Sequence, residues 1–131
     1  MVCLDTSILV AILRKEEDVM RRFEKEALQG TRVSTTAINL CELYAGANGA
    51  RNPDKELAKV DGLVDLLDIL QFNVDACRKY GEKINHKKLK SEPIGDFDLI
   101  IACIAMAHRE ALITRNIQHF ARVPELIVQQ W

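Results

Sequence analysis

An apolar stretch, Leu99 to Ala107, limits most strongly what this chain can fold into. A helix with one apolar face can lie on a surface, but a helix that is apolar on every side must be covered all round. The stretch is far too short to cross a bilayer. Acidic residues precede it, where the positive end of a helix dipole favours them, and a short apolar strand candidate, residues 111–114, follows. We therefore expect a buried helix that leads into a strand inside a globular core.

Short apolar runs alternate with segments of helical periodicity along the rest of the chain. We expect strands at residues 2–4, 31–34, 69–74, 111–114 and 126–128, and helices over about 8–13, 19–28, 38–43, 53–67, 75–89 and 96–110. This alternation predicts an α/β sandwich around a central, mainly parallel sheet of four or five strands, with its functional site at the carboxyl ends of the strands. The length of 131 residues and the 48% hydrophobic content suit a single domain over 1–131.

The cysteines and the N-terminus give expectations about the compartment. Cys3, Cys41, Cys77 and Cys103 lie far apart, without a Cys-x-x-Cys pair, and each has aliphatic neighbours. They are predicted to be small buried side chains of a protein in a reducing compartment. Because no signal peptide or membrane span is evident either, we expect a soluble protein in the cytoplasm.

Three carboxylates occupy positions where a charge needs an explanation. Asp5 ends the first strand, Glu42 interrupts an otherwise apolar helix beside the small residues Ala45 and Gly46, and Asp98 shares a face with the core side of the buried helix. Each also has a structural interpretation. Asp5 can bond the amides of the helix that follows, Glu42 can reach out to water, and acids at the start of a helix complement its dipole.

Two helix starts follow from the same pattern. Thr6 or Ser7 is expected to cap the first helix, and Asp96 is expected to cap the buried one.

In the predicted fold, Asp5, Glu42 and Asp98 converge at one end of the sheet. Carboxylates held together without a cation repel and raise one another's pKa. Mg²⁺ or Mn²⁺ would resolve the repulsion and activate a water for attack on phosphorus.

Four segments in order resemble the PIN-domain ribonucleases, and they look most like the VapC toxins of toxin–antitoxin pairs. The segments are Leu4-Asp5-Thr6-Ser7, Ser34-Thr35-Thr36 leading to Cys41-Glu42-Leu43, Ile94 to Ala102, and Leu112-Ile113-Thr114-Arg115-Asn116 with Phe120. The resemblance spans nearly the whole chain. It implies a PIN-like α/β/α sandwich and a Mg²⁺- or Mn²⁺-dependent endoribonuclease that hydrolyses tRNA, rRNA or mRNA. It further implies a homodimer and a cognate antitoxin protein that covers the site.

The resemblance also assigns site residues. Asp5, Glu42 and Asp98 are the implied catalytic acids and metal ligands, and Asp96 is a neighbour that caps the helix or binds metal through water. Family members often carry a further acid where this chain has Asn116 or His119, so we expect one firmly bound ion. Asn116 can offer a carbonyl oxygen to a metal-bound water, and His119 can contact a phosphate. Ser7 and Thr114 are expected to position the acids through hydroxyl hydrogen bonds.

The formal net charge of -1 hides an uneven distribution of charge. Residues 54–68 are predominantly acidic, whereas residues 78–90 are predominantly basic and directly precede the Asp96 turn. We expect RNA phosphates to contact basic side chains near the site, with Arg14, Lys87, Lys88 and Arg115 as the candidates. The structural alternative for a charge run is a solvated helix face.

Two other function classes are compatible with the sequence. A catalytically degenerate PIN-like module that binds RNA or a protein partner would explain the missing acid near Asn116. A phosphotransfer domain would also carry a strand-end aspartate, but here Asp5 is followed by Thr6 and Ser7, not by a second aspartate.

Overall fold

A five-stranded, all-parallel sheet forms the centre of the molecule. The computed structural model describes all of residues 1–131. The strand order is β3-β2-β1-β4-β5, with bounds β1 Val2–Leu4, β2 Val33–Thr36, β3 Asp68–Leu70, β4 Ala111–Ile113 and β5 Val128–Gln129. β1 lies in the middle, where Val2 pairs with Val33 on one side and with Ala111 on the other. The predicted α/β fold with a mainly parallel sheet is confirmed.

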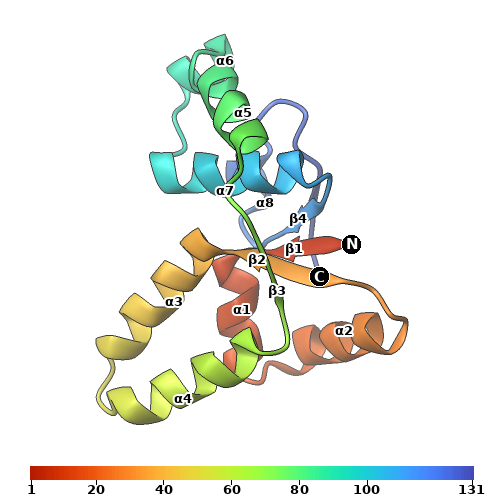
Figure 1. The fold of residues 1–131 in the computed structure, drawn as a ribbon, viewed down its shortest axis with the longest axis vertical. Coiled ribbons are helices and arrows are strands. Elements are labelled where there is room, and N and C mark those ends of the chain that lie inside the picture. The colour runs from red at the N-terminus through yellow and green to blue at the C-terminus, as the bar shows by residue number, and fades with distance from the viewer.

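Eight helices connect the strands and cover both faces of the sheet (Figure 1). Their bounds are α1 Thr6–Leu13, α2 Glu17–Leu28, α3 Ala37–Asn48, α4 Pro53–Val64, α5 Val74–Ile84, α6 Lys87–Ser91, α7 Asp96–Ala107 and α8 Ile117–Phe120. Helices α1 to α4 pack on one face, and α5 to α8 pack on the other.

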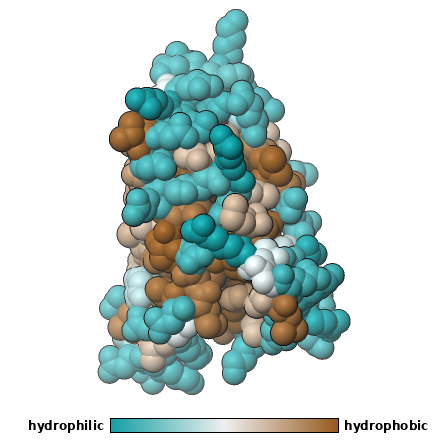
Figure 2. Space-filling view, turned by 45° about the vertical axis from the view of Figure 1, so that its right-hand side comes forward, coloured by the Kyte–Doolittle hydropathy of each residue, from teal (hydrophilic) through white to brown (hydrophobic).

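The period-two alternation of the strands divides the core between the two faces. In β1, Cys3 packs with the α5–α8 side and Leu4 with the α1–α4 side. In β4, Leu112 and Ile113 divide in the same way, because successive side chains of a strand point to opposite faces. On the face shown in Figure 2, hydrophilic side chains cover the two ends, and apolar side chains reach the surface mainly across the middle.

Helix α7 is the buried apolar helix that the sequence predicts. Six of its residues are buried, namely Leu99, Ile101, Ala102, Cys103, Ile104 and Ala105. The predicted cap is wrong, because Asp96 is already the first helical residue and Gly95 holds the N-cap position with φ 92°. That left-handed backbone conformation suits glycine and disfavours other residues. The predicted caps Thr6 and Ser7 are also wrong, since Asp5 occupies the N-cap position of α1.

Other local predictions also need correction. Cys3 and Cys103 are buried, but Cys41 and Cys77 are exposed on their helices. The polar helix expected over 75–89 is two helices, α5 and α6. His86 separates them, and its ring Nδ1 accepts a hydrogen bond from the Lys88 amide at 3.1 Å and so caps α6. The last strand begins at Val128 instead of Leu126. No helix is both long and apolar enough to cross a membrane.

The division of the core predicts where a leucine matters for stability. Leu112 is 0% exposed in β4, whereas Leu28 is 89% exposed at the end of α2. Leu112→Ala should lower the free energy of unfolding by about 2–5 kcal/mol, because it leaves a cavity between the sheet and α7. Leu28→Ala should change it by less than about 0.5 kcal/mol. Urea unfolding monitored by circular dichroism measures both, and equal effects would contradict the assignment of the core.

Candidate active site

Asp5 lies at the carboxyl end of the central strand, where several hydrogen bonds fix its side chain. Its backbone amide donates to the Ile113 carbonyl at 2.9 Å, which ties the end of β1 to β4. Its carboxylate Oδ2 accepts from the Thr114 hydroxyl at 2.7 Å and from the Ser7 hydroxyl at 3.3 Å. The side chain makes no capping bond to α1. Asp5, 5% exposed, is thus held by neighbouring side chains and not by the helix amides.

Asn39 belongs to the site, although it was not among the residues predicted from the sequence. It is fully buried in the first turn of α3, where it forms a capping box with Thr36. Its side-chain amide donates to Asp5 Oδ1 at 3.2 Å and to the Thr6 hydroxyl at 3.0 Å. The signal was present in the sequence, because Thr36-x-x-Asn39 is a possible capping box and Asn39 lies three residues before Glu42 on the same helix.

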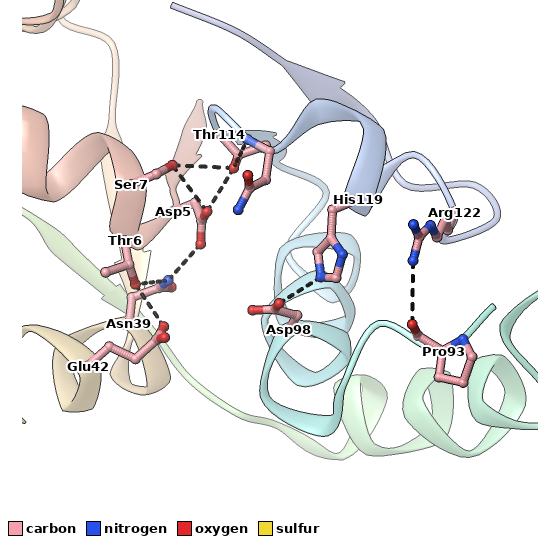
Figure 3. Close-up of polar contacts among 11 residues, drawn as sticks. Asp5, Thr6, Ser7, Asn39, Glu42, Pro93, Asp98, Thr114, His119 and Arg122 are labelled. Carbon is pink, nitrogen blue, oxygen red and sulfur yellow. Dashed lines mark hydrogen bonds and ion pairs between the residues drawn. The ribbon is translucent and has the colours of Figure 1, made fainter.

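Glu42 extends from α3 toward the same region. The Thr6 hydroxyl donates to Glu42 Oε1 at 2.8 Å, so Asn39 and Thr6 connect the two carboxylates of Asp5 and Glu42 (Figure 3). The pKa of Glu42 is raised above its usual range, first by partial desolvation and then by repulsion from Asp5 and Asp98. The bond from Thr6 acts in the opposite direction. Neither Asp5 nor Glu42 forms an ion pair with a basic residue.

Asp98 approaches the site from α7 and pairs with His119. His119 Nε2 lies 2.8 Å from Asp98 Oδ2, and the side chains are 30% and 33% exposed. The imidazole comes from α8 and meets the Phe120 ring edge-on, at 5.3 Å between centroids. Sequence reasoning placed His119 at a position of interest but did not foresee its pairing with Asp98. The pair joins α8 to the start of α7.

The three predicted acids face one common space, but they do not yet form a closed coordination shell. Figure 3 shows Asp5, Glu42 and Asp98 pointing toward the same region from three different elements. No three acidic, histidine or cysteine side chains stand close enough together to hold a metal ion as they are. Asp5 is fixed, so the more exposed Glu42 and Asp98 are the side chains that would have to move toward an ion. The donors are carboxylate oxygens, which Mg²⁺ and Mn²⁺ prefer.

The other predicted residues lie around this space in different ways. Asp96 accepts a hydrogen bond from the Tyr80 hydroxyl at 3.2 Å, on the α5 side of α7. The backbone amide of Asn116 donates to the Thr114 hydroxyl at 3.0 Å. Arg115 pairs with Glu16 at 2.9 Å, and its amide donates to Ser7 at 3.1 Å. Arg14 lines a groove together with Glu42.

The basic side chains of residues 78–90 differ in their exposure to solvent. Lys87 and Lys88 are exposed on α6. Lys83, in contrast, is only 2% exposed and lies within 3.4 Å of both Glu82 and Glu125. Lys83 therefore belongs to the structural framework and is not available to an RNA phosphate.

The causes of the raised Glu42 pKa give a test of the geometry. Asp98→Asn removes a negative charge that faces Glu42, so it should lower the Glu42 pKa toward its usual range. Thr6→Val removes the hydrogen bond that stabilises the carboxylate, so it should raise the pKa further. NMR titration of the Glu42 side-chain carboxyl carbon measures both shifts. Shifts of the same sign would contradict the arrangement of Figure 3.

Comparison with known proteins identifies the family. The family model named PIN domain matches residues 2–126. The chain is 30% identical to "Ribonuclease VapC1" of Haemophilus influenzae (strain R2866) over 98% of this chain and 96% of that relative. It is also 30% identical to the "tRNA(fMet)-specific endonuclease VapC" of Salmonella typhimurium, with the same two coverages.

A solved structure of a similar protein has the same fold as this chain. The crystal structure of VapBC2 from Rickettsia felis, bound to a DNA fragment from its promoter, superposes with a TM-score of 0.92 at 29% identity, over 100% of this chain and 99% of that chain. Other structural neighbours are likewise toxin–antitoxin complexes. The chain therefore belongs to the PIN-domain family and, within it, to the VapC ribonucleases, the toxins of toxin–antitoxin systems.

Proposed function

We propose that this VapC-type ribonuclease hydrolyses RNA phosphodiester bonds with the help of a Mg²⁺ or Mn²⁺ ion held by Asp5, Glu42 and Asp98. The supporting observation is that these carboxylates face one space at the carboxyl edge of the sheet, while Asp5 and Glu42 have no basic partner (Figure 3). Such an ion would supply charge neutralisation and activate a water for attack on phosphorus. We further expect the cleavage to take place in the cytoplasm.

The chain's own residues position the acids. Thr114, Ser7 and Asn39 together fix both oxygens of Asp5, so this carboxylate keeps its orientation while substrate binds. Thr6 holds one oxygen of Glu42 and leaves the other free. His119 orients Asp98. Because Tyr80 engages Asp96, any contribution of Asp96 to the ion would pass through water.

The RNA is proposed to reach the acids along basic side chains. Arg14 lies beside Glu42 in the groove, and Arg115 follows the strand end that carries Thr114. Lys87 and Lys88 remain predictions for more distant phosphate contacts. A few phosphate contacts fix the register of a strand without reading its sequence. We expect a structured RNA, namely tRNA, rRNA or mRNA, as the substrate.

A groove beside Glu42 suits the proposed antitoxin. It has a volume of about 400 Å³ and lies between α1, α3 and α4, with Val10, Leu13, Leu43, Ala47 and Val60 among its lining residues. An amphipathic helix fits such an apolar groove. An arginine of the same partner could pair with Glu42 at the edge of the groove and keep the ion out. We further expect the toxin to act as a homodimer.

Removal of single carboxylates tests the catalytic assignment. Asp5→Asn and Glu42→Gln should each reduce cleavage of total RNA in Mg²⁺ or Mn²⁺ at least about a hundredfold, because each removes a proposed ligand of the ion. Arg21→Gln, on the exposed surface of α2, should retain wild-type activity. Gel analysis of cleavage products measures this. Equal cleavage by all variants would exclude the proposed site.

Metal binding separates this enzyme from a catalytically degenerate PIN-like module. Calorimetry with Mn²⁺ should show saturable binding to the wild type that Asp98→Asn weakens strongly. A protein that binds RNA but shows no Mn²⁺ binding dependent on Asp98 would be the degenerate module instead.

The antitoxin groove can be tested with two matched glycine substitutions. A Cβ placed at Gly46 or at Gly81 meets no atom within 4 Å, so both helices can accept a side chain there. Gly46→Arg fills the groove and should abolish copurification with the co-expressed product of an adjoining small reading frame. Gly81→Arg, on α5, should leave copurification intact. Retention of the partner by both variants would place the antitoxin elsewhere.

A further inference from the structure

A second hollow is lined by His119, the residue that pairs with Asp98. It has a volume of about 480 Å³ and is formed by residues 115–119 together with Arg122 and Gln130. Its lining consists of two arginines, one histidine, three amide side chains and a single apolar residue, Ile117. The hollow is therefore polar, in contrast to the groove proposed for the antitoxin.

The charge of this lining distinguishes it from the other hollows of the molecule. Each of the other three includes at least one carboxylate among its lining residues. This hollow includes none, and it carries Arg115 and Arg122. Their partners lie outside the lining, with Glu16 2.9 Å from Arg115 and Glu92 3.5 Å from Arg122. These pairs are partly exposed and therefore weak, so a phosphate can compete with them.

The amide side chains of the hollow are free to bind a ligand. Asn116, Gln118 and Gln130 are exposed, and none of their side chains is engaged within the fold. A primary amide presents a donor and an acceptor side by side. Unpaired RNA bases are read through hydrogen bonds to their edges and by stacking on histidine or arginine planes, and this lining offers both kinds of contact.

His119 connects the hollow to the proposed catalytic acids. It lines the hollow, and its Nε2 lies 2.8 Å from Asp98. A strand whose scissile phosphate lies among Asp5, Glu42 and Asp98 would therefore bring an adjacent nucleotide to His119.

We propose that this hollow binds the nucleotide next to the scissile phosphate and sets the sequence preference of cleavage. Arg122 and Arg115 bind a phosphate of the RNA strand, and Gln118 and Gln130 contact the edge of its base. The inference rests on the proposed ribonuclease function.

The test uses RNA binding to a protein that does not cleave. Wild-type cleavage sites in total RNA are mapped first, and fluorescence anisotropy then follows labelled RNA oligonucleotides that contain such a site or differ from it at one flanking position. The background is Glu42→Gln. Into it are placed Arg122→Gln, Gln118→Ala with Gln130→Ala, and, as a control, the exposed Arg21→Gln.

The two kinds of variant should behave differently. Arg122→Gln should weaken binding to every oligonucleotide. It should also reduce the steepness of the plot of log binding constant against log salt concentration by about one, as expected for one lost phosphate contact. The double amide variant should weaken binding about tenfold to the mapped sequence and less to the altered ones, because base contacts carry the specificity. Arg21→Gln should change neither quantity.

The outcomes separate this inference from the proposed function. If the wild type cleaves RNA but Arg122→Gln binds like Arg21→Gln, or the amide variant weakens all sequences equally, the hollow is not the nucleotide site. If Arg122→Gln disturbs only the antitoxin complex, the hollow belongs to a protein partner and the inference is also wrong. A wild type that neither cleaves nor binds RNA would instead refute the proposed function itself.

Discussion

The site depends on one buried carboxylate, Asp5, at the end of the central strand. Burying a charge is costly unless hydrogen bonds satisfy it. Here the donors come from three parts of the chain: Ser7 on α1, Asn39 on α3 and Thr114 after β4. The amide of Asp5 adds a bond to Ile113. The same contacts that satisfy this charge therefore join β1, β4, α1 and α3, so the fold and the site share one polar network.

The remaining acids are held less firmly than Asp5, and this difference suits their proposed roles. Glu42 has one hydrogen bond from Thr6 and a raised pKa, and Asp98 is paired only with His119. With one fixed ligand and two adjustable ones, the proposed site would close around an ion while the scaffold stays unchanged.

The α/β class, the mainly parallel sheet and the places of the acids at the ends of strands and helices were predictable from the sequence, because short-range patterns indicate them, whereas the strand order was not predicted. The apolar stretch 99–107 required a buried helix, and Asp5 directly followed a strand. The contacts between distant residues were not predictable in the same way. His119 and Asp98 are separated by 21 positions and meet only because α8 folds back over the start of α7. Asn39 was missed because a buried amide in a capping box also has a purely structural role, and Gly95 displaced the predicted cap because its backbone, φ 92°, sets where α7 begins.

The central claim is that Asp5, Glu42 and Asp98 form one divalent-ion site. The most direct measurement is a crystal structure of the protein grown with Mn²⁺, with anomalous diffraction data collected to locate the ion. We expect an anomalous peak within coordination distance of all three carboxylates, with Glu42 and Asp98 turned toward it and Asp5 unmoved. A structure in which Mn²⁺ binds elsewhere, or in which the three carboxylates remain apart with no peak between them, would contradict it.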